Sequence, residues 1–471
     1  MVDASTKRPL GVIAEPVGAA AGGQRGGGAA MAKRGFLRAL GILFSSRVVS
    51  AATLLAIGIL TARLLGPEGR GHYALFFTIV GIGANFGGFG LTQSNTYFLN
   101  REHVPMAVLF GNTIFSIGVV GLLAAGGIGI VESYPGIAGM GTAWAFPGWL
   151  LWLAIIVAIL ESHVGGLAYG SHLYAFQARS LVVQAALLLA ATLALYPAGA
   201  SLSAALEFRV AAAVLFIVWY VQRFLAHVSL REIAVRTATL KKQLRFGMKN
   251  WLQNQIGLLN YRGYLLILAA FSGPESVGHF SIALLFAEAV RFIPETVGTL
   301  LLPKLVGLHP GEGPAQLTAR ACRMIVLCML VLGFGLAVSV DWLIPIVFGA
   351  LYSGSVAATI LLLPGAVLGA VYQVLTRYFT SEHAQRYSIA GGISGLIVAL
   401  SASVVLVPGY QAAGASAAYS LSALTTCVVV LWGFGRQSKL SPYAAIIPSR
   451  EDWMILGRLA AAKVLKEKTK E

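Results

Sequence analysis

Three arginines stand inside stretches of the sequence that are otherwise apolar, namely Arg47, Arg262 and Arg291. A charged side chain near the centre of a bilayer costs about 2.5–3.5 kcal/mol, so each of these positions indicates either a function or an ion pair. A guanidinium group can bind two phosphate oxygens at once and stays charged at physiological pH. We therefore take Arg47, Arg262 and Arg291 as candidates for a cationic cavity wall that holds a phosphate-bearing ligand.

Two asparagines accompany these arginines in the apolar stretches. Asn85 lies in a glycine-rich segment, and Asn254 lies about two helical turns before Arg262 on the same helical face. Amide groups donate and accept hydrogen bonds, which suits a ligand rich in hydroxyl groups. Asn85 and Asn254 are therefore candidate binding residues beside the arginines.

Glu288, Arg291 and Glu295 are spaced at i, i+3 and i+7 on one predicted helix, which Pro294 is expected to interrupt. Two interpretations remain open. Arg291 could form an ion pair with Glu288 or Glu295 inside the protein, because buried charges normally pair. Alternatively, Arg291 binds a ligand, and Glu288 or Glu295 carries protons that couple its movement to an ion gradient.

The elements that must position these residues are membrane helices. The chain is 57% hydrophobic and 11% charged, whereas a soluble chain is roughly 25% charged. Apolar stretches of about 20 residues recur along it, and no strand-period alternation competes with them. We predict an all-α integral membrane protein with about 12 spans. These spans are placed near 40–63, 72–96, 105–131, 147–168, 179–197, 203–225, 249–271, 279–302, 321–347, 355–377, 387–407 and 411–434.

A ten-residue stretch occurs twice, as "GPEGRGHYAL" at 66–75 and as "GPESVGHFSI" at 273–282, an offset of 207 positions. Gly66 and Gly273 suit the left-handed position just after a helix, and the proline after each stops that helix. The motif is predicted to be a structural turn. The offset places Asn254 where the first half has Arg47. Six spans in each half predict parallel repeats that form two bundles around a central cavity.

The basic residues predict the orientation and the domain organisation. Four loops predicted on one side, at 132–146, 197–202, 341–354 and 408–411, contain no Lys or Arg. By the positive-inside rule both termini are cytoplasmic, in a multi-pass protein of the bacterial cytoplasmic (inner) membrane. The formal net charge of +16 is thus a topology signal and not a nucleic-acid footprint. The predicted segments are a disordered tail at 1–35, bundles at 36–230 and 249–435, a basic linker at 231–248, and a basic tail at 436–471 that could form an interfacial helix.

The remaining charged residues in or near the spans are predicted to be structural. Some extend from helix ends to the interface, some form helix contacts, and some lie at a solvated helix end. The residues that extend to the interface are Arg63, Arg70 and Arg377. Those at a helix contact are Glu207 and Arg209, and those at a solvated helix end are Glu161 and His163.

The run "ARLLGPEGRGHYAL" at 62–75 resembles the signature of polysaccharide flippases (O-antigen or exopolysaccharide, Wzx-type) in the multidrug/oligosaccharidyl-lipid/polysaccharide exporter superfamily. The run from Phe246 to Leu305, which includes "SGPESVGHFSIALLFAEAVRFIPE", is similar to the matching part of that family. The resemblance covers roughly residues 36–435. It implies two six-helix bundles in a V shape that move a polyprenyl-diphosphate-linked oligosaccharide by alternating access. It also implies membrane lipid and polysaccharide polymerase machinery as partners, and no cofactor.

Other functions remain as alternatives. A cation-coupled, MATE-like multidrug antiporter would need a cavity of the opposite sign, and a peptidoglycan-precursor flippase typically has fourteen helices. A membrane-embedded glycan polymerase or ligase would need larger loops outside the membrane. The sequence has no G-x-x-x-x-G-K-[ST], H-E-x-x-H or paired CxxC motif, so we expect a transporter rather than an enzyme, without a metal site.

Overall fold

The computed structural model describes residues 27–133, 146–199, 201–306 and 313–447. All regular elements in these ranges are helices, which confirms the predicted all-α class. The helices are α1 (Gly27–Gly87), α2 (Leu91–Asn100), α3 (Met106–Ser133), α4 (Gly148–Gly170), α5 (Tyr174–Leu193), α6 (Leu195–Ala198), α7 (Leu202–Leu225), α8 (Thr237–Val306), α9 (Pro314–Phe348), α10 (Ser355–Ser381) and α11 (Arg386–Ser438). Short 3-10 turns occur at Leu230–Glu232, Ala350–Tyr352 and Pro442–Ala445.

Nine helices in the described ranges are long and apolar enough to cross a membrane. Three of them, α1, α8 and α11, contain one residue with non-helical backbone angles, at Gly66, Gly273 and Gln411 respectively. These three breaks lie where the sequence predicts one span to end and the next to begin. Dividing the helices there gives twelve apolar segments, and the number that cross a membrane stays a prediction.

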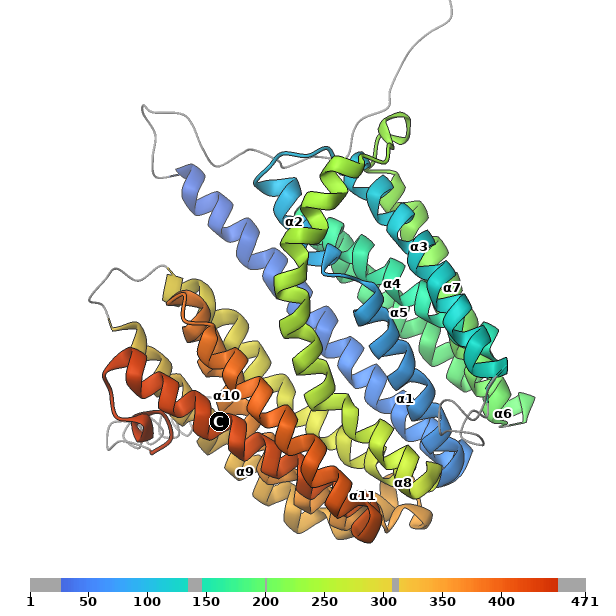
Figure 1. Ribbon diagram of the computed structural model, residues 1–471, viewed down its shortest axis with the longest axis vertical. Coiled ribbons are helices and arrows are strands. Elements are labelled where there is room, and N and C mark those ends of the chain that lie inside the picture. Colours follow the sequence, from blue (N-terminus) through green and yellow to red (C-terminus); the bar gives the residue numbers. More distant parts are fainter. Residues whose placement is uncertain (1–26, 134–145, 200, 307–312, 448–471) are drawn as a thin grey trace, which may run out of the picture.

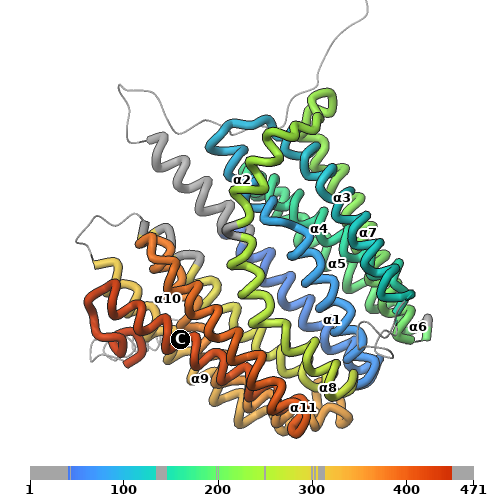
Figure 2. The backbone as a smooth tube through the Cα atoms, viewed as in Figure 1, coloured from blue at the N-terminus to red at the C-terminus, as the bar shows by residue number. Residues whose placement is uncertain are grey.

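The helices pack in two groups that meet along α1 and α8 (Figure 1). In the first group α1 packs on α5, and α4 packs on α2, α3 and α7; in the second, α8, α10 and α11 pack on one another. The pair of α1 and α8 is among the most extensive helix contacts of the described structure. The course of the backbone in Figure 2 shows the same two groups on either side of this pair. The predicted domain boundaries themselves stay a prediction.

Each copy of the doubled motif breaks its helix at a glycine. Gly66 has φ 66° and ψ 178°, and Gly273 has φ 78° and ψ 177°. The positive φ confirms the expectation from sequence, but ψ lies near 180° rather than in the left-handed helical region. That combination is essentially restricted to glycine. Pro67 and Pro274 follow directly and open the next helical segment, where a missing N–H costs nothing.

The two copies of the motif contact each other reciprocally. A Cβ atom on Gly71 would overlap the carbonyl oxygen of Pro274, and a Cβ atom on Gly278 would overlap the carbonyl oxygen of Pro67. Backbone therefore packs directly on backbone across the junction of the two groups, an approach that glycine allows. The duplicated sequence thus builds a joint with approximate twofold symmetry.

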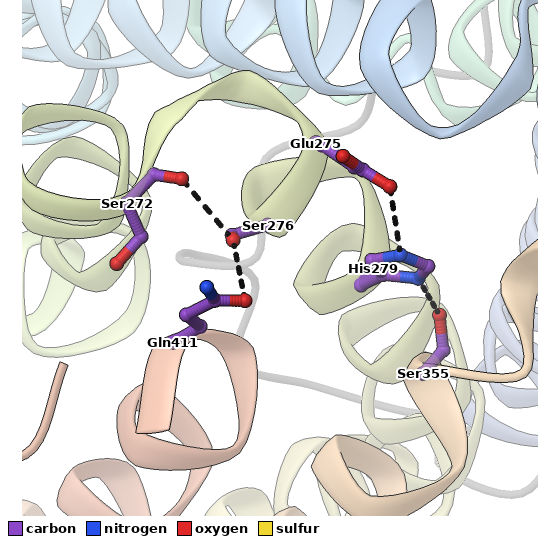
Figure 3. Close-up of polar contacts among 6 residues, drawn as sticks. All are labelled: Ser272, Glu275, Ser276, His279, Ser355 and Gln411. Carbon is purple, nitrogen blue, oxygen red and sulfur yellow. Dashed lines mark hydrogen bonds and ion pairs between the residues drawn. The ribbon is translucent and has the colours of Figure 1, made fainter. Parts of the chain in front are cut away.

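Polar contacts hold the second copy of the motif to its own group of helices (Figure 3). His279 lies 3.9 Å from a carboxylate oxygen of Glu275 and 3.1 Å from the hydroxyl of Ser355 on α10. The hydroxyl of Ser276 lies 3.4 Å from Oε1 of Gln411, the residue at which α11 breaks. The breaks in α8 and α11 are therefore linked side by side.

Two predicted segments differ from the structure. Residues 27–35 of the predicted disordered tail belong to α1, and α8 begins at Thr237, so most of the predicted 231–248 linker is helical. The first turns of α8 pack on α2 and α3, and this packing buries Gln243 completely. Its amide group bonds Asn112 and Asn95 at 2.7 Å each. A buried amide, two lysines and an arginine give this part of the helix low hydropathy, so the apolar periodicity misses it. The predicted interfacial helix near the C-terminus lies outside the described residues.

The reciprocal glycine contact predicts the effect of adding one methyl group. Gly71→Ala or Gly278→Ala should lower the free energy of unfolding by at least about 3 kcal/mol, because backbone atoms must move apart. Gly263→Ala is the matched control, since nothing lies within 4 Å of a Cβ atom there, and its effect should stay within about 1 kcal/mol. Thermal denaturation of the purified proteins in detergent measures both. Equal midpoints for Gly71→Ala and Gly263→Ala would contradict the joint.

Candidate functional site

A cavity of about 730 Å³ opens beside α8, α10 and α11; we call it the Tyr261 cavity. Asn85 of α1 is its contribution from the first group of helices. Its polar lining residues are Asn85, Asn254, Asn260, Tyr261, Arg291, Glu295, Tyr372, Gln373, Tyr419, Ser422 and Thr426. The volume is in the range of small-molecule sites, and amide and hydroxyl groups dominate the polar part of the wall.

Arg262, which follows Tyr261 directly, and Arg291, on the segment of α8 after the break at Gly273, both lie near the Tyr261 ring. The guanidinium carbon of Arg291 is 4.3 Å from the centre of the Tyr261 ring, and that of Arg262 is 5.9 Å from it. Cations attracted to a ring face in this way remain charged and can still donate hydrogen bonds. The structure therefore places one guanidinium in the Tyr261 cavity and the other beside it.

A second cavity, of about 260 Å³, lies between α1, α7 and α8, and we call it the arginine cavity. Arg70, Arg209 and Arg262 line it, with Glu288 as its acidic residue. Nη2 of Arg262 lies 3.3 Å from Oε1 of Glu288, which is an ion pair. Three cations face one anion, so the cavity has the sign that attracts an anionic ligand.

Arg70 is buried in the wall of the arginine cavity. Only 7% of the residue is exposed, although the sequence predicts that it extends to the interface. It donates hydrogen bonds to the hydroxyls of Thr61, at 2.6 Å, and Ser281, at 3.3 Å. The prediction was wrong because Ser281 and the covering surface come from the other half of the chain. The doubled motif contained a signal for the burial of Arg70, because the second copy has the apolar Val277 at the equivalent position, and Val277 is fully buried.

Two further arginines make contacts that the sequence did not predict. The guanidinium carbon of Arg209 lies 4.6 Å from the centre of the Phe77 ring, so this residue faces the arginine cavity as well as a helix contact. Arg63 is exposed, and it donates to the carbonyl oxygens of Val347, at 2.7 Å, and Ile346. These carbonyls lie in the last turn of α9, where backbone acceptors lack helical partners. Arg63 therefore caps α9.

The sequence left open which acid pairs with Arg291. Glu288 pairs with Arg262 instead, one helical segment earlier, while Glu295 lines the Tyr261 cavity with Arg291. The predicted interruption at Pro294 was wrong: α8 remains helical on both sides of this residue. A membrane helix tolerates proline where neighbouring groups satisfy the freed carbonyl.

A third cavity, of about 330 Å³, connects the two groups of helices at the break between α1 and α2; we call it the Trp251 cavity. Phe89 and Gly90 have positive φ there. The indole N–H of Trp251 lies 3.2 Å and 3.1 Å from the carbonyl oxygens of Asn85 and Phe86, which end α1. Gln255 donates to the Asn85 carbonyl at 3.2 Å. Side chains of α8 thus cap the broken helix of the other group.

Of the five candidate binding residues predicted from sequence, the structure brings four to these cavities. Asn85 and Asn254 line both the Tyr261 cavity and the Trp251 cavity, Arg262 lines the arginine cavity, and Arg291 lines the Tyr261 cavity. Arg47 is exposed on α1 and belongs to none of these walls. It lies one turn after Phe44, whose ring centre is 6.1 Å from that of Phe292 on α8. The roles of all five residues stay predictions.

Comparisons with known proteins agree with this architecture. The sequence model of a family described as "Polysaccharide biosynthesis protein" matches residues 60–357. No curated protein sequence gives a significant match. The fold is similar to that of the lipid II flippase MurJ in an inward closed conformation, with a TM-score of 0.68 at 12% identity over 90% of this chain and 96% of that one.

Two transporters of the MOP superfamily share the fold as well. An inward-facing multidrug resistance MATE family transporter gives a TM-score of 0.65 at 16% identity, over 83% of this chain and 96% of that one. A transporter from Pyrococcus furiosus, described by the reverse polarity of its binding pocket, gives 0.55 at 15% identity, over 85% of this chain and 94% of that one. At such identities the likeness shows the fold, and with the family match it confirms the resemblance found in the sequence.

The contacts of Arg70 predict how stability responds to its removal. The hydroxyls of Thr61 and Ser281 also donate to the backbone carbonyls of Ile57 and Gly278, at 2.7 Å and 2.8 Å, so neither depends on Arg70. Replacing a buried charge by an apolar side chain of similar size is often neutral or stabilising. The free energy of unfolding of Arg70→Met should therefore lie within about 1 kcal/mol of the wild-type value, or above it. A loss of several kcal/mol in thermal denaturation would show instead that Arg70 holds the fold together.

Proposed function

The chain belongs to the polysaccharide biosynthesis protein family, and we propose that it is a flippase for a polyprenyl-diphosphate-linked oligosaccharide. In this proposal it carries the lipid across the bacterial cytoplasmic membrane by alternating access, for the assembly of a surface polysaccharide. The observation that carries the proposal is the arginine cavity, in which Arg70, Arg209 and Arg262 face a single acid, Glu288. The family and the transporter fold support transport, and the sign of this cavity supports an anionic cargo.

The chemistry of the cargo matches the neighbouring cavities. A diphosphate carries oxygens that arginine forks bind bidentately, which suits the arginine cavity and the nearby Arg291. A glycan presents many hydroxyl groups, which suits the amides and phenols of Asn254, Asn85 and their neighbours in the Tyr261 cavity. The polyprenyl tail can remain in the lipid. We propose that Arg47, near the Phe44–Phe292 contact of α1 and α8, meets the diphosphate at the mouth between these helices.

The ion pair of Arg262 and Glu288 suggests how substrate binding and protonation could be coupled. A diphosphate would compete with Glu288 for Arg262, because both are anions that bind the same guanidinium. Displacement by the diphosphate would leave the Glu288 carboxylate without its cation, which makes it available to a coupling ion. We propose Glu288 as a coupling residue on this basis, with Glu295 of the Tyr261 cavity as a second candidate.

The alternatives make different demands on the cavities. A drug antiporter of the MATE type carries cations, and three arginines in one cavity disfavour them. A peptidoglycan-precursor flippase remains the nearer alternative, because that cargo also carries a diphosphate and the MurJ fold is shared. The proposal places both termini in the cytoplasm, on the positive-inside distribution of Lys and Arg.

The first prediction from this function concerns the lipids of a deletion strain. Removing the gene should cause a polyprenyl diphosphate oligosaccharide to accumulate in the membrane, with loss of a surface glycan. Mass spectrometry of extracted lipids measures the accumulated species, and reintroduction of the gene is the control. Accumulation of a peptidoglycan precursor instead would support the MurJ-like alternative. An unchanged lipid profile with altered sensitivity to cationic drugs would support the antiporter.

The second prediction concerns the arginines. Arg262→Ala, Arg291→Met and Arg47→Ala should each reduce complementation of the deletion strain about 10-fold or more, the expected loss of a hydrogen-bonded charge. Arg386→Met is a matched control, because Arg386 also stacks on a tyrosine, 4.9 Å from the ring centre of Tyr387, but is exposed outside these cavities. Immunoblotting of membranes establishes that each variant is present. Full complementation by both Arg47→Ala and Arg262→Ala would contradict the cationic-cavity proposal.

A further inference from the structure

Glu161 of α4 lies between two cavities that the proposed cargo site does not explain. It lines the Trp251 cavity, and it also lines a separate cavity of about 200 Å³ with walls from α2, α4, α5 and α7. We call this second space the Glu161 cavity. The sequence predicts a solvated helix end for Glu161, whereas the structure places this residue in the wall shared by these two cavities.

The carboxylate of Glu161 has one hydrogen-bond donor and no ion pair within the described structure. The amide nitrogen of Gln184 on α5 donates to its Oε1 at 2.7 Å. An acid at membrane depth is costly when ionised, and a neutral amide offsets only part of that cost. Such residues in transporters commonly take up and release protons. Glu161 is therefore a candidate proton site rather than part of a structural salt bridge.

The groups that face Glu161 from each neighbouring helix are mostly neutral. The titratable residues that share its cavities are Tyr169 of α4 and Tyr220 of α7, and the other polar lining residues are neutral amides and hydroxyls. Arg209 of α7 is the cation that acts on the carboxylate electrostatically. His163, two residues further on, bonds the backbone oxygen of Ile159 at 2.7 Å. None of these neighbours neutralises the charge by direct contact.

The hydrogen bonds in the Glu161 cavity favour a proton over a metal ion. The Tyr220 hydroxyl donates to Oε1 of Gln177 at 2.6 Å, and the hydroxyls of Thr92 and Ser162 lie 3.0 Å apart. These oxygens are already engaged, whereas a metal ion needs several free oxygen ligands. Groups of three or more His, Cys, Asp or Glu side chains suited to a metal do not occur among the described residues. A proton needs only the carboxylate.

We propose that Glu161 binds a proton and that its protonation favours the closed arrangement in which α8 covers the Trp251 cavity. Trp251 and Gln255 of α8 line this cavity and bond the end of α1. Closure removes water from the carboxylate, which disfavours its ionised form. Opening would hydrate it and release the proton. By linkage, the closed population rises as the pH falls, and a proton gradient across the membrane biases the opening of the two groups of helices.

Charge movement after a pH jump tests this proposal without any glycan lipid. Purified protein in proteoliposomes on a solid-supported membrane is stepped from pH 8 to pH 6, and the transient current is recorded. Glu161→Gln, which keeps an oxygen to accept from Gln184, should reduce the transient at least 10-fold. Glu207→Gln is the control, because Glu207 is an exposed acid in the same group of helices, and it should match the wild type.

A second variant tests the titration itself. Gln184→Leu removes the donor to the ionised carboxylate, so the midpoint of the transient should move to higher pH by about one unit. A purely structural role for Gln184 would leave that midpoint unchanged. If Glu161→Gln is not monodisperse in size-exclusion chromatography, the shift in Gln184→Leu decides the outcome.

Three results would overturn the proposal. These are a full transient in Glu161→Gln, an equal loss in Glu207→Gln, and a transient that follows a sodium jump at constant pH and disappears in Glu161→Gln. The last result would assign the site to a metal cation. Because no glycan lipid is present, failure here leaves the proposed flippase function standing, and failure of lipid accumulation in the deletion strain leaves the proton site standing.

Discussion

The backbone contact between the two copies of the doubled motif is the constraint on which the rest of the structure depends. The carbonyl oxygens of Pro274 and Pro67 pack against Gly71 and Gly278, respectively, and leave no room for a side chain there. This contact brings α1 and α8 together at one end and fixes how the two groups of helices meet there. The walls of the arginine cavity come from these same two helices, together with α7. Its geometry therefore follows from the joint.

α8 carries a second set of contacts between the groups at the other end of the described structure. Gln243 is buried in an amide network with Asn95 and Asn112, and Gly247 meets Gly90 backbone to backbone. The helix then continues into the second group, where Arg262 and Glu288 lie on its two segments. One element thus reaches the first group, the cavities and the joint. Movement of the two groups relative to each other must rearrange α8 or its contacts.

The charges of the molecule are separated by type along these cavities. Arginines gather where α1, α7 and α8 meet, whereas Glu161 lies alone between the Trp251 cavity and the Glu161 cavity. Desolvation makes an unpaired charge energetically costly. Such residues are retained where a ligand or a proton neutralises them during function. An anionic cargo and a proton would use these two regions for different steps of one cycle.

The sequence by itself determined the membrane helices and their breaks, because hydropathy, glycine and proline act within a few residues. The positive φ at Gly66 and Gly273, and the involvement of Arg262 and Arg291 in the cavities, followed from local patterns of that kind. Only the tertiary structure decided which charged residues share an enclosed space. Arg70 is buried because Ser281 lies against it from 211 positions away, and Glu161 shares its cavities with residues from both groups of helices. Apolar periodicity cannot distinguish a helix face that meets lipid from one that meets protein, and that difference decides where a charge is buried.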